Sequence, residues 1–264
     1  MLLLVCSAQG VTGSTDTEQI DASSLFVETA FRATPWDQEK LEEQSSRRHA
    51  RVLFVSESNV CRSVLAEAVM NELLQQRGLQ DAVQCESKGT RDYNVGEGPE
   101  AFVLEVAREE GLALPHDFHA RQLVPETDIV AFDIVLVMDK FTAADVLREV
   151  SVFDSINSQG GYSRRVRRLG EFHPTMAAAT ATDAQDLDDP LYGNSQDDAE
   201  KEAVRETLWN IREACRGLVD FLQQLRDSDA TDKGEGGSLR SALSAAVQDM
   251  ESVDWLVPPM LQKR

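Results

Sequence analysis

The segment from Arg51 to Ser63, with the sequence RVLFVSESNVCRS, constrains the fold of this chain more than any other segment. Its four consecutive apolar residues, Val52–Val55, predict a buried strand. The apolar residues that follow recur at the spacing of one helix face, at Leu65, Val69 and Leu73. A short loop over residues 56–62 therefore connects the carboxyl end of a strand to the N-terminus of a helix.

Such a loop is suited to binding an anion. Backbone N–H groups converge at a helix N-terminus, and the helix dipole adds partial positive charge there. Arg62 adds a planar set of donors that matches the geometry of phosphate. The sequence therefore predicts that residues 56–62 hold a phosphate-like anion.

Charge and composition narrow the classes of partner. The chain has 264 residues, a hydrophobic content of 42% and a formal net charge of −20, so we expect one domain of ordinary size with extensions. Nucleic acids and anionic membrane surfaces both attract basic footprints, and we predict neither as a partner. The basic run Arg164–Arg168 is a local exception. It could contact an acidic or phosphorylated partner, although solvated charge at a sheet edge is the simpler interpretation.

Cysteine usage and the N-terminus indicate the compartment. The four cysteines, at positions 6, 61, 85 and 215, show no close pairing or metal-ligand spacing, so we expect free thiols, no metal and no cofactor. The apolar run Met1–Val5 is too short for a signal sequence or a membrane span. We expect a cytoplasmic protein, and organelle targeting stays open.

Three regions follow from the distribution of polar and apolar residues. Residues 1–48 form an N-terminal extension, partly disordered, with a short helix beginning at Thr34–Pro35. Residues 49–226 form the domain. Residues 227–264 comprise a linker, rich in Gly and charge over Asp227–Ser238, and a C-terminal amphipathic helix. That helix could dock onto the domain or onto a protein partner, and the sequence does not decide between the two.

Strands alternate with helices through the domain. Further strands are predicted at Ala82–Ser87, Ile134–Met138 and Val166–Phe172, and helices at Pro99–Gly111 and Val204–Leu225. Continuous apolar strands suit a sheet that is covered on both faces. We therefore predict an α/β fold, a four-stranded parallel sheet with helices on both faces, and a ligand-binding loop at its C-terminal edge.

A strand, a tight loop with Asn59, the sequence Cys-Arg-Ser and a helix containing Ala-Glu-Ala together resemble the signature of low-molecular-weight protein tyrosine phosphatases. Further blocks similar to that family, in the family's order, are Ser87–Thr90, Tyr93–Gly96, Ala120–Leu123, Phe132–Asp133, Met138–Asp139, Leu169–Gly170 and Asp189–Gly193. The family's catalytic Cys precedes the loop Arg by six positions. In this chain that position is occupied by Ser56.

The resemblance implies a role for each matched residue. The catalytic positions are Ser56 for the nucleophile, Arg62 for phosphate binding and Asp189 for the general acid. The residues of the phosphate-binding loop and its support are Glu57, Ser58, Asn59, Val60, Cys61, Ser63 and Ser87. The residues implied for specificity are Tyr93, Leu191 and Tyr192.

The departures from the family pattern concentrate in the implied site. Besides Ser56, the family's Leu-Gly after the Cys is Glu57–Ser58 here, and Glu57 adds negative charge to an anion site. The family's Pro after Arg-Ser is Val64, its His in the pattern His-x-Ala-Arg-Gln is Phe118, and a Tyr at the second specificity position is Leu191.

These departures leave three hypotheses. A Ser hydroxyl becomes a nucleophile only beside a general base. We therefore favour a pseudophosphatase that binds a phosphotyrosine-containing protein or another small phosphate anion without efficient hydrolysis. Alternatively, an active phosphatase of altered mechanism uses Ser56 or water, with Asp189 as the acid. In the third hypothesis the chain is a scaffold whose loop binds nothing, and Glu57 favours it.

Overall fold

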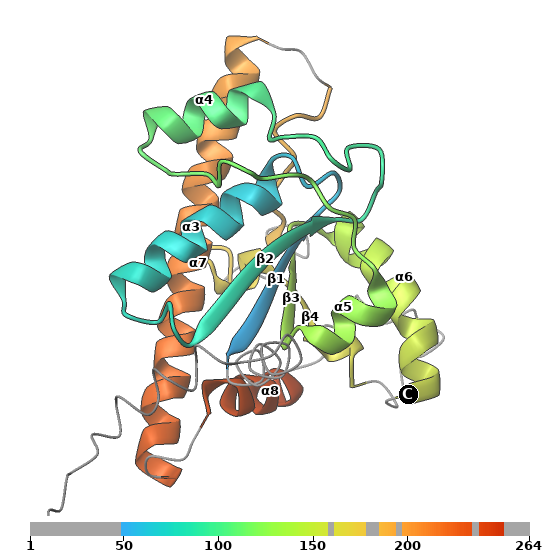
Figure 1. Ribbon diagram of the computed structural model, residues 1–264, viewed down its shortest axis with the longest axis vertical. Coiled ribbons are helices and arrows are strands. Elements are labelled where there is room, and N and C mark those ends of the chain that lie inside the picture. The colour runs from blue at the N-terminus through green and yellow to red at the C-terminus, as the bar shows by residue number, and fades with distance from the viewer. Residues whose placement is uncertain (1–48, 158–160, 178–184, 194–196, 234–237, 251–264) are drawn as a thin grey trace, which may run out of the picture. The chain divides into compact units, whose positions relative to one another are not determined.

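The computed structural model describes residues 49–157, 161–177, 185–193, 197–233 and 238–250 (Figure 1). The helices and strands follow the numbering of Figure 1 and are β1 (Ala50–Ser56), α3 (Arg62–Gln76), β2 (Val83–Gly89), α4 (Ala101–Glu109), α5 (Pro125–Ala131), β3 (Ile134–Val137), α6 (Lys140–Asn157), η1 (Ser163–Arg165), β4 (Val166–Arg168), η2 (Leu169–Phe172), α7 (Asp198–Lys233) and α8 (Leu239–Asp249). The short helix predicted after Thr34 lies outside the described residues, as do residues 251–264.

All four strands are parallel, in the order β2-β1-β3-β4 (Figure 1). β1 is flanked by β2, with Ser56 opposite Gly89, and by β3, with Val55 opposite Val137. This arrangement confirms the predicted four-stranded parallel sheet. The loop after β1 therefore lies between the carboxyl ends of β2 and β3. Ligands of open α/β sheets bind beyond the carboxyl ends of the strands, at a position of this kind.

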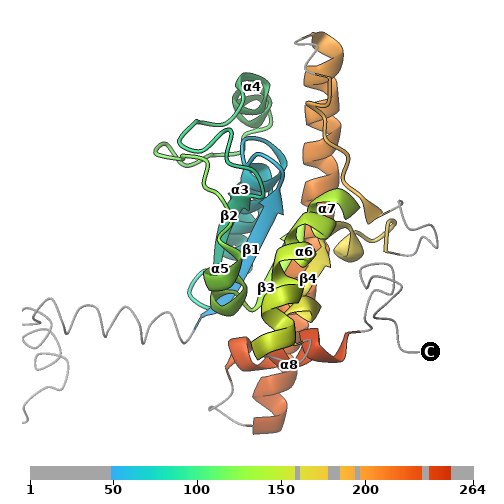
Figure 2. The ribbon, with the colours of Figure 1, turned by 90° about the vertical axis from the view of Figure 1, so that its right-hand side faces the viewer.

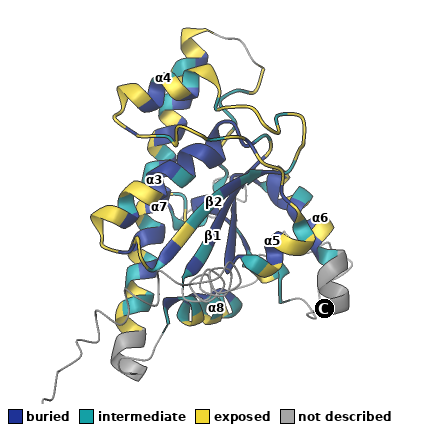
Figure 3. Ribbon diagram, viewed as in Figure 1, coloured by how far each residue is buried: buried dark blue, intermediate teal, exposed yellow. Residues whose placement is uncertain are grey.

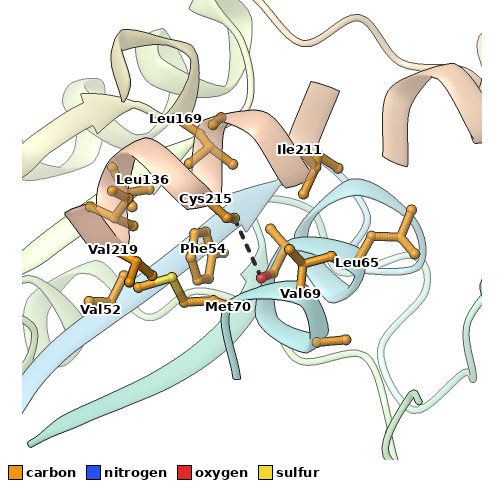
Figure 4. Packing of buried hydrophobic residues seen from close by; sticks show 14 of the residues in the cluster. Val52, Phe54, Leu65, Val69, Met70, Leu136, Leu169, Ile211, Cys215 and Val219 are labelled. Atoms are coloured by element: carbon orange, nitrogen blue, oxygen red, sulfur yellow. Dashed lines mark hydrogen bonds between the residues drawn. The ribbon is translucent and has the colours of Figure 1, made fainter. Parts of the chain in front are cut away.

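Helices cover both faces of the sheet, as predicted (Figure 2). Alternate residues of β1 enter two separate cores because successive side chains of a strand point to opposite faces. Phe54 packs among residues of α3 and α7, including Met70, Cys215 and Val219 (Figure 4). Leu53, on the other face, belongs to the core that α5 and α6 cover.

The fourth strand is shorter than the sequence predicts. The prediction covers Val166–Phe172, but β4 ends at Arg168 and a short 3-10 helix, η2, follows. The carboxylate of Glu171 explains the end of the strand, because it accepts the backbone N–H of Arg168 at 3.0 Å and the Nε–H of Arg167 at 2.7 Å. These bonds turn the backbone away from the extended conformation.

The linker predicted from Asp227 to Ser238 is wrong over its first half. α7 contains the whole predicted helix Val204–Leu225 and continues through Lys233. Charged residues have adequate helix propensity, and neither Gly nor Pro occurs between Arg226 and Lys233. The helix ends immediately before Gly234.

The C-terminal helix α8 docks onto the domain. Its apolar residues Leu239, Leu243 and Val247 are buried in the core that also contains Phe54 (Figure 3). The Arg240 guanidinium forms an ion pair with Asp133 at 3.1 Å. The apolar face of the helix is therefore covered by the same chain, which is the first of the two alternatives left by the sequence.

The arginines of the basic run Arg164–Arg168 all bond to other parts of the protein, and only Arg164 among them is exposed. Arg165 Nη1 donates to backbone carbonyls at the end of α5, Arg168 forms an ion pair with Asp186 at 2.8 Å, and Arg164 donates to the carbonyl of Gln248 at 2.7 Å. β4 is an edge strand as expected, and the interpretation of the charges as solvated is wrong for the buried Arg168, whereas Arg164 is exposed. Among the described helices, none combines the length and hydropathy needed to cross a membrane.

Candidate functional site

The loop after β1 is held by the segment that follows β2. Thr90 N–H donates to the carbonyl of Ser56, and Arg91 N–H donates to that of Glu57, both at 2.9 Å. Gly89 permits this approach because a Cβ at that position would lie 2.9 Å from the Glu57 carbonyl oxygen and about as close to Ser58. The C-terminal edge of the sheet therefore fixes the backbone of the loop.

Ser56 is buried at the end of β1, with only 2% of its surface exposed. Its Oγ lies 2.8 Å from Ser63 Oγ and accepts the backbone N–H of Asn59 at 3.2 Å. A hydroxyl and an amide are its hydrogen-bond partners within the described part of the chain, and neither is a base at neutral pH. The hydroxyl is therefore oriented but not activated by these contacts.

Asn59 links the loop to two neighbouring segments. Its backbone has φ of 58°, in the left-handed region that Asn tolerates better than most residues. Its side-chain Nδ2 donates to Ser63 Oγ and Ser87 Oγ, both at 3.0 Å, and its Oδ1 accepts the N–H of Arg121 at 2.8 Å. The backbone of Arg121 thus satisfies the Asn59 oxygen although Phe118 replaces the family's His.

Arg62 lies at the start of α3, and 2% of its surface is exposed. Its Nη1 donates to Asp139 and to the carbonyl of Leu187 at 2.9 Å, and its Nη2 donates to Asp189 at 2.8 Å. Burial disfavours the guanidinium charge, but the two carboxylates outweigh that effect and raise the pKa of Arg62. Arg62 is therefore a permanent buried cation beneath the loop.

Asp139 is a site residue to which the sequence alone assigned no role. Burial raises the pKa of the Asp139 carboxyl. The positive charge of Arg62 and the backbone N–H of Thr142, which donates to Asp139 Oδ1 at 2.7 Å, outweigh burial and hold that pKa below its usual value. A signal for it was present, because Asp139 directly follows the apolar run Ile134–Met138. Polar residues after neighbouring parallel strands meet at the same sheet edge.

Asp189 is brought to Arg62 across 127 positions of sequence. Its Oδ1 accepts the N–H of Leu191 at 3.1 Å, and the N–H of Leu187, just before it, donates to the carbonyl of Met138 at 2.8 Å. The structure therefore places the implied general acid and the implied phosphate ligand within reach of one small anion.

Cys61 is the N-terminal cap residue of α3 and carries a buried free thiol. Burial raises its pKa well above the usual value, and the negative charge of Asp189 adds to this, while Arg62 lowers it in part. The thiolate is the nucleophilic form of cysteine. Cys61 therefore does not replace the missing nucleophile at position 56.

The residues implied for specificity lie in different environments. Tyr93 is 59% exposed, and its hydroxyl donates to Glu57 Oε1 at 2.7 Å. Leu191 packs against the main core, whereas Tyr192 is 92% exposed. No hydrogen bond or ring contact between described residues connects Tyr192 to Tyr93 in this structure. Val60 is buried with Cys61, and Ser58 is half-buried.

Residues 51–229 match the family model described as "Low molecular weight phosphotyrosine protein phosphatase". The chain belongs to the low-molecular-weight phosphotyrosine protein phosphatase family. The match covers the sheet, the loop and most of α7, and it ends before α8.

Individual proteins and solved structures are also similar to this chain. The "Low molecular weight protein-tyrosine phosphatase A" of Mycobacterium tuberculosis is 34% identical over 173 residues, which are 66% of this chain and 91% of that protein. The crystal structure of YfkJ from Bacillus subtilis superposes with a TM-score of 0.53 and 26% identity, covering 67% of this chain and 96% of that one. The YwlE arginine phosphatase of Bacillus subtilis superposes with a TM-score of 0.53 at 22% identity, covering 67% of this chain and 98% of that one. That structure is of a Cys-to-Ser mutant with a phosphorylated active-site serine.

Proposed function

We propose that this chain is a pseudophosphatase of the low-molecular-weight family, which binds phosphotyrosine or another phosphate monoester at residues 56–62 without efficient hydrolysis. The site keeps Arg62 paired with Asp189 at 2.8 Å, but the hydroxyl at the nucleophile position contacts only Ser63 and the amide of Asn59 among the described residues. Binding groups are retained, whereas an activated nucleophile is not.

The size of the kinetic loss follows from the missing thiolate. A Cys at a helix N-terminus can have a pKa in the range of about 3.5–7.5, so it is ionised at neutral pH. A Ser needs a base to remove its proton. Removing an enzyme's nucleophile costs about a millionfold in rate, or about 8 kcal/mol of barrier. We therefore expect binding to be measurable where turnover is not.

Calorimetric titration with inorganic phosphate and with a phosphotyrosine peptide tests this proposal, with hydrolysis of an aryl phosphate assayed in parallel. Binding of both ligands without turnover supports it. Arg62→Lys keeps the charge but loses the planar set of donors, so we expect the affinity to fall about tenfold or more. Arg77→Lys is the matched control, because Arg77 forms an exposed ion pair with Asp220 at 3.0 Å. A thermal melt of each variant checks that it is folded.

A second candidate function is an active phosphatase of altered mechanism. Arg62 and Asp189 favour it, and so does the YwlE Cys-to-Ser mutant, which carries phosphate on its active-site serine. In this mechanism the Ser56 oxygen bonds to phosphorus while its proton passes to a phosphate oxygen, the bond to the leaving oxygen breaks, and a protonated Asp189 gives its proton to that oxygen. Water then hydrolyses the phosphoserine, which releases phosphate and restores the Ser56 hydroxyl. Robust turnover by the unmodified protein that Ser56→Ala abolishes, with phosphoserine at position 56 in mass spectra, would establish it and overturn the first proposal.

The scaffold hypothesis predicts a third outcome of the same titration. Under it, neither inorganic phosphate nor the phosphotyrosine peptide binds, and no turnover is detected. The exposed Glu57 carboxylate beside the loop is the observation that favours this result.

A further inference from the structure

Glu57 occupies the rim of the loop in a fixed position. Its carbonyl accepts the N–H of Arg91 at 2.9 Å, which holds its backbone, and its carboxylate accepts the hydroxyl of Tyr93 at 2.7 Å. Partial burial of the Tyr93 hydroxyl and its bond to Glu57 raise the pKa of Tyr93 to about 12. The tyrosine therefore stays a neutral donor at physiological pH, and it orients the carboxylate without neutralising it.

The cations around the loop are already paired with other carboxylates. Arg62 is bound by Asp139 and Asp189, and Arg91 forms an ion pair with Asp145 at 2.6 Å. Among the described residues, Glu57 forms no ion pair. The rim consequently has an exposed negative charge that the protein itself does not balance.

A phosphate dianion entering the loop meets this charge, and a cation carried by the ligand would relieve the repulsion. We propose that Glu57 is a specificity-determining residue that selects phosphorylated peptides with Lys or Arg beside the phosphorylated residue, and that Tyr93 holds its carboxylate in place. The inference rests on the proposed function, because it assumes that the loop binds the phosphate group.

Two phosphotyrosine peptides that differ only in their flanking residues, Arg in one and Glu in the other, test the inference. Their dissociation constants are measured for the full chain and for Glu57→Gln. The preference is the ratio of the dissociation constant of the acidic peptide to that of the basic peptide. An exposed ion pair contributes little, so we expect Glu57→Gln to lower this ratio about two- to fivefold. High salt should also lower the ratio in the unmodified protein.

A matched control separates this local effect from the net charge of −20, which attracts any basic peptide. Glu126→Gln removes the same charge from the first turn of α5, and we expect it to leave the preference unchanged. Tyr93→Phe keeps the ring and loses the hydrogen bond, so it should weaken the preference less than Glu57→Gln does.

The outcomes separate the two proposals. If both peptides bind and Glu57→Gln alters the preference no more than Glu126→Gln does, the inference about Glu57 is overturned and the binding function stands. If neither peptide nor inorganic phosphate binds the unmodified protein, the proposed function fails and the inference fails with it. If Glu57→Gln loses more of the preference for the basic peptide than Glu126→Gln does, the result supports both the proposed function and the inference about Glu57.

Discussion

Replacing one sulfur by oxygen at position 56 changes the ionisation of the nucleophile position while the surrounding donors stay in place. Ser63 and Asn59 still orient the side chain, and Arg62 still lies beneath the loop. Oriented donors and charges stabilise a transition state only when a reactive group can reach it. Introducing sulfur alone tests whether the rest of the site is intact, and we predict from the negative charge of Glu57 that it is not.

The single variant Ser56→Cys should give little hydrolysis of an aryl phosphate, whereas adding Glu57→Leu and Ser58→Gly should give at least about tenfold more. The physical reason is that nearby negative charge raises the pKa of a Cys, and each unit changes the thiolate fraction about tenfold. Initial rates of the unmodified protein, the single variant and the triple variant near pH 6 measure this. Equal rates for the single and triple variants would show that Glu57 and Ser58 do not limit the chemistry.

Buried thiols make the stability of the domain sensitive to alkaline pH. Burial raises the pKa of both Cys61 and Cys215 in the folded state. Above pH about 9 the unfolded chain loses these protons and the folded chain keeps them. The free energy of unfolding should therefore fall as pH rises, by up to about 1.4 kcal/mol per pH unit for each thiol.

Urea unfolding at several pH values between about 7 and 10.5, a range that brackets the ordinary pKa of a thiol, measures this slope. Cys215→Ala removes one of the thiols and should make the slope shallower, even though the variant is less stable at neutral pH because it leaves a cavity. A stability that is independent of pH across this range would contradict the assignment of neutral buried thiols.

At the scale of elements, the segment that carries Asp189 is anchored by a buried ion pair. Arg168 of β4 is 1% exposed and contacts Asp186 at 2.8 Å and the side chain of Gln185. Burial raises the pKa of Asp186, and Arg168 offsets part of that effect. Gly170 allows this approach, because a Cβ there would lie 2.1 Å from the Gln185 carbonyl oxygen. The end of β4 and the Asp-Pro segment are thus joined.

Removing one member of this pair should be costly, because it leaves the other charge buried without a partner. We expect Arg168→Met to lower the free energy of unfolding by about 3–5 kcal/mol, and the double variant Arg168→Met, Asp186→Leu to recover much of that loss. Arg77→Met breaks the exposed pair with Asp220 and should cost at most about 1 kcal/mol. Urea unfolding of the unmodified protein and these variants measures the free energies of unfolding. A double variant no more stable than Arg168→Met would contradict the claim that the loss comes from leaving Asp186 buried without a partner.

The elements that the sequence predicted well have local signals, and those it missed depend on tertiary contacts. Val52–Val55 is apolar without interruption, so a buried strand followed from the residues alone. The end of β4 depends on the hydrogen bond that the backbone N–H of Arg168 donates to the Glu171 carboxylate, and no sequence pattern predicts that bond. The Arg62–Asp189 pair could be expected only from the resemblance, since 127 positions separate its members. The hydrogen bond from Tyr93 to Glu57 could not be expected at all.

At the scale of the whole domain, the candidate site lies at one end of the sheet and α8 packs at the other. The loop lies beyond the carboxyl ends of β1 and β3, and α8 contacts the same two strands. Asp133, just before β3, accepts from Arg240 of α8 at 3.1 Å and from the backbone N–H of Arg51 at 2.9 Å. α8 therefore closes the amino end of the sheet, away from the loop (Figures 1 and 2). The family match ends at residue 229, so α8 lies outside the matched region.

This arrangement predicts that α8 contributes to stability without contributing to anion binding. Leu243 is fully buried in the main core, so Leu243→Ala should lower the free energy of unfolding by about 2–5 kcal/mol. Ser241→Ala, on the exposed side of the same helix, should change it by no more than about 0.5 kcal/mol. Phosphate affinity, measured where each variant is fully folded, should match that of the unmodified protein in both cases. A Leu243→Ala protein of unchanged stability would show that α8 is not docked in solution, and a folded variant with altered phosphate affinity would show that the two ends of the sheet are coupled.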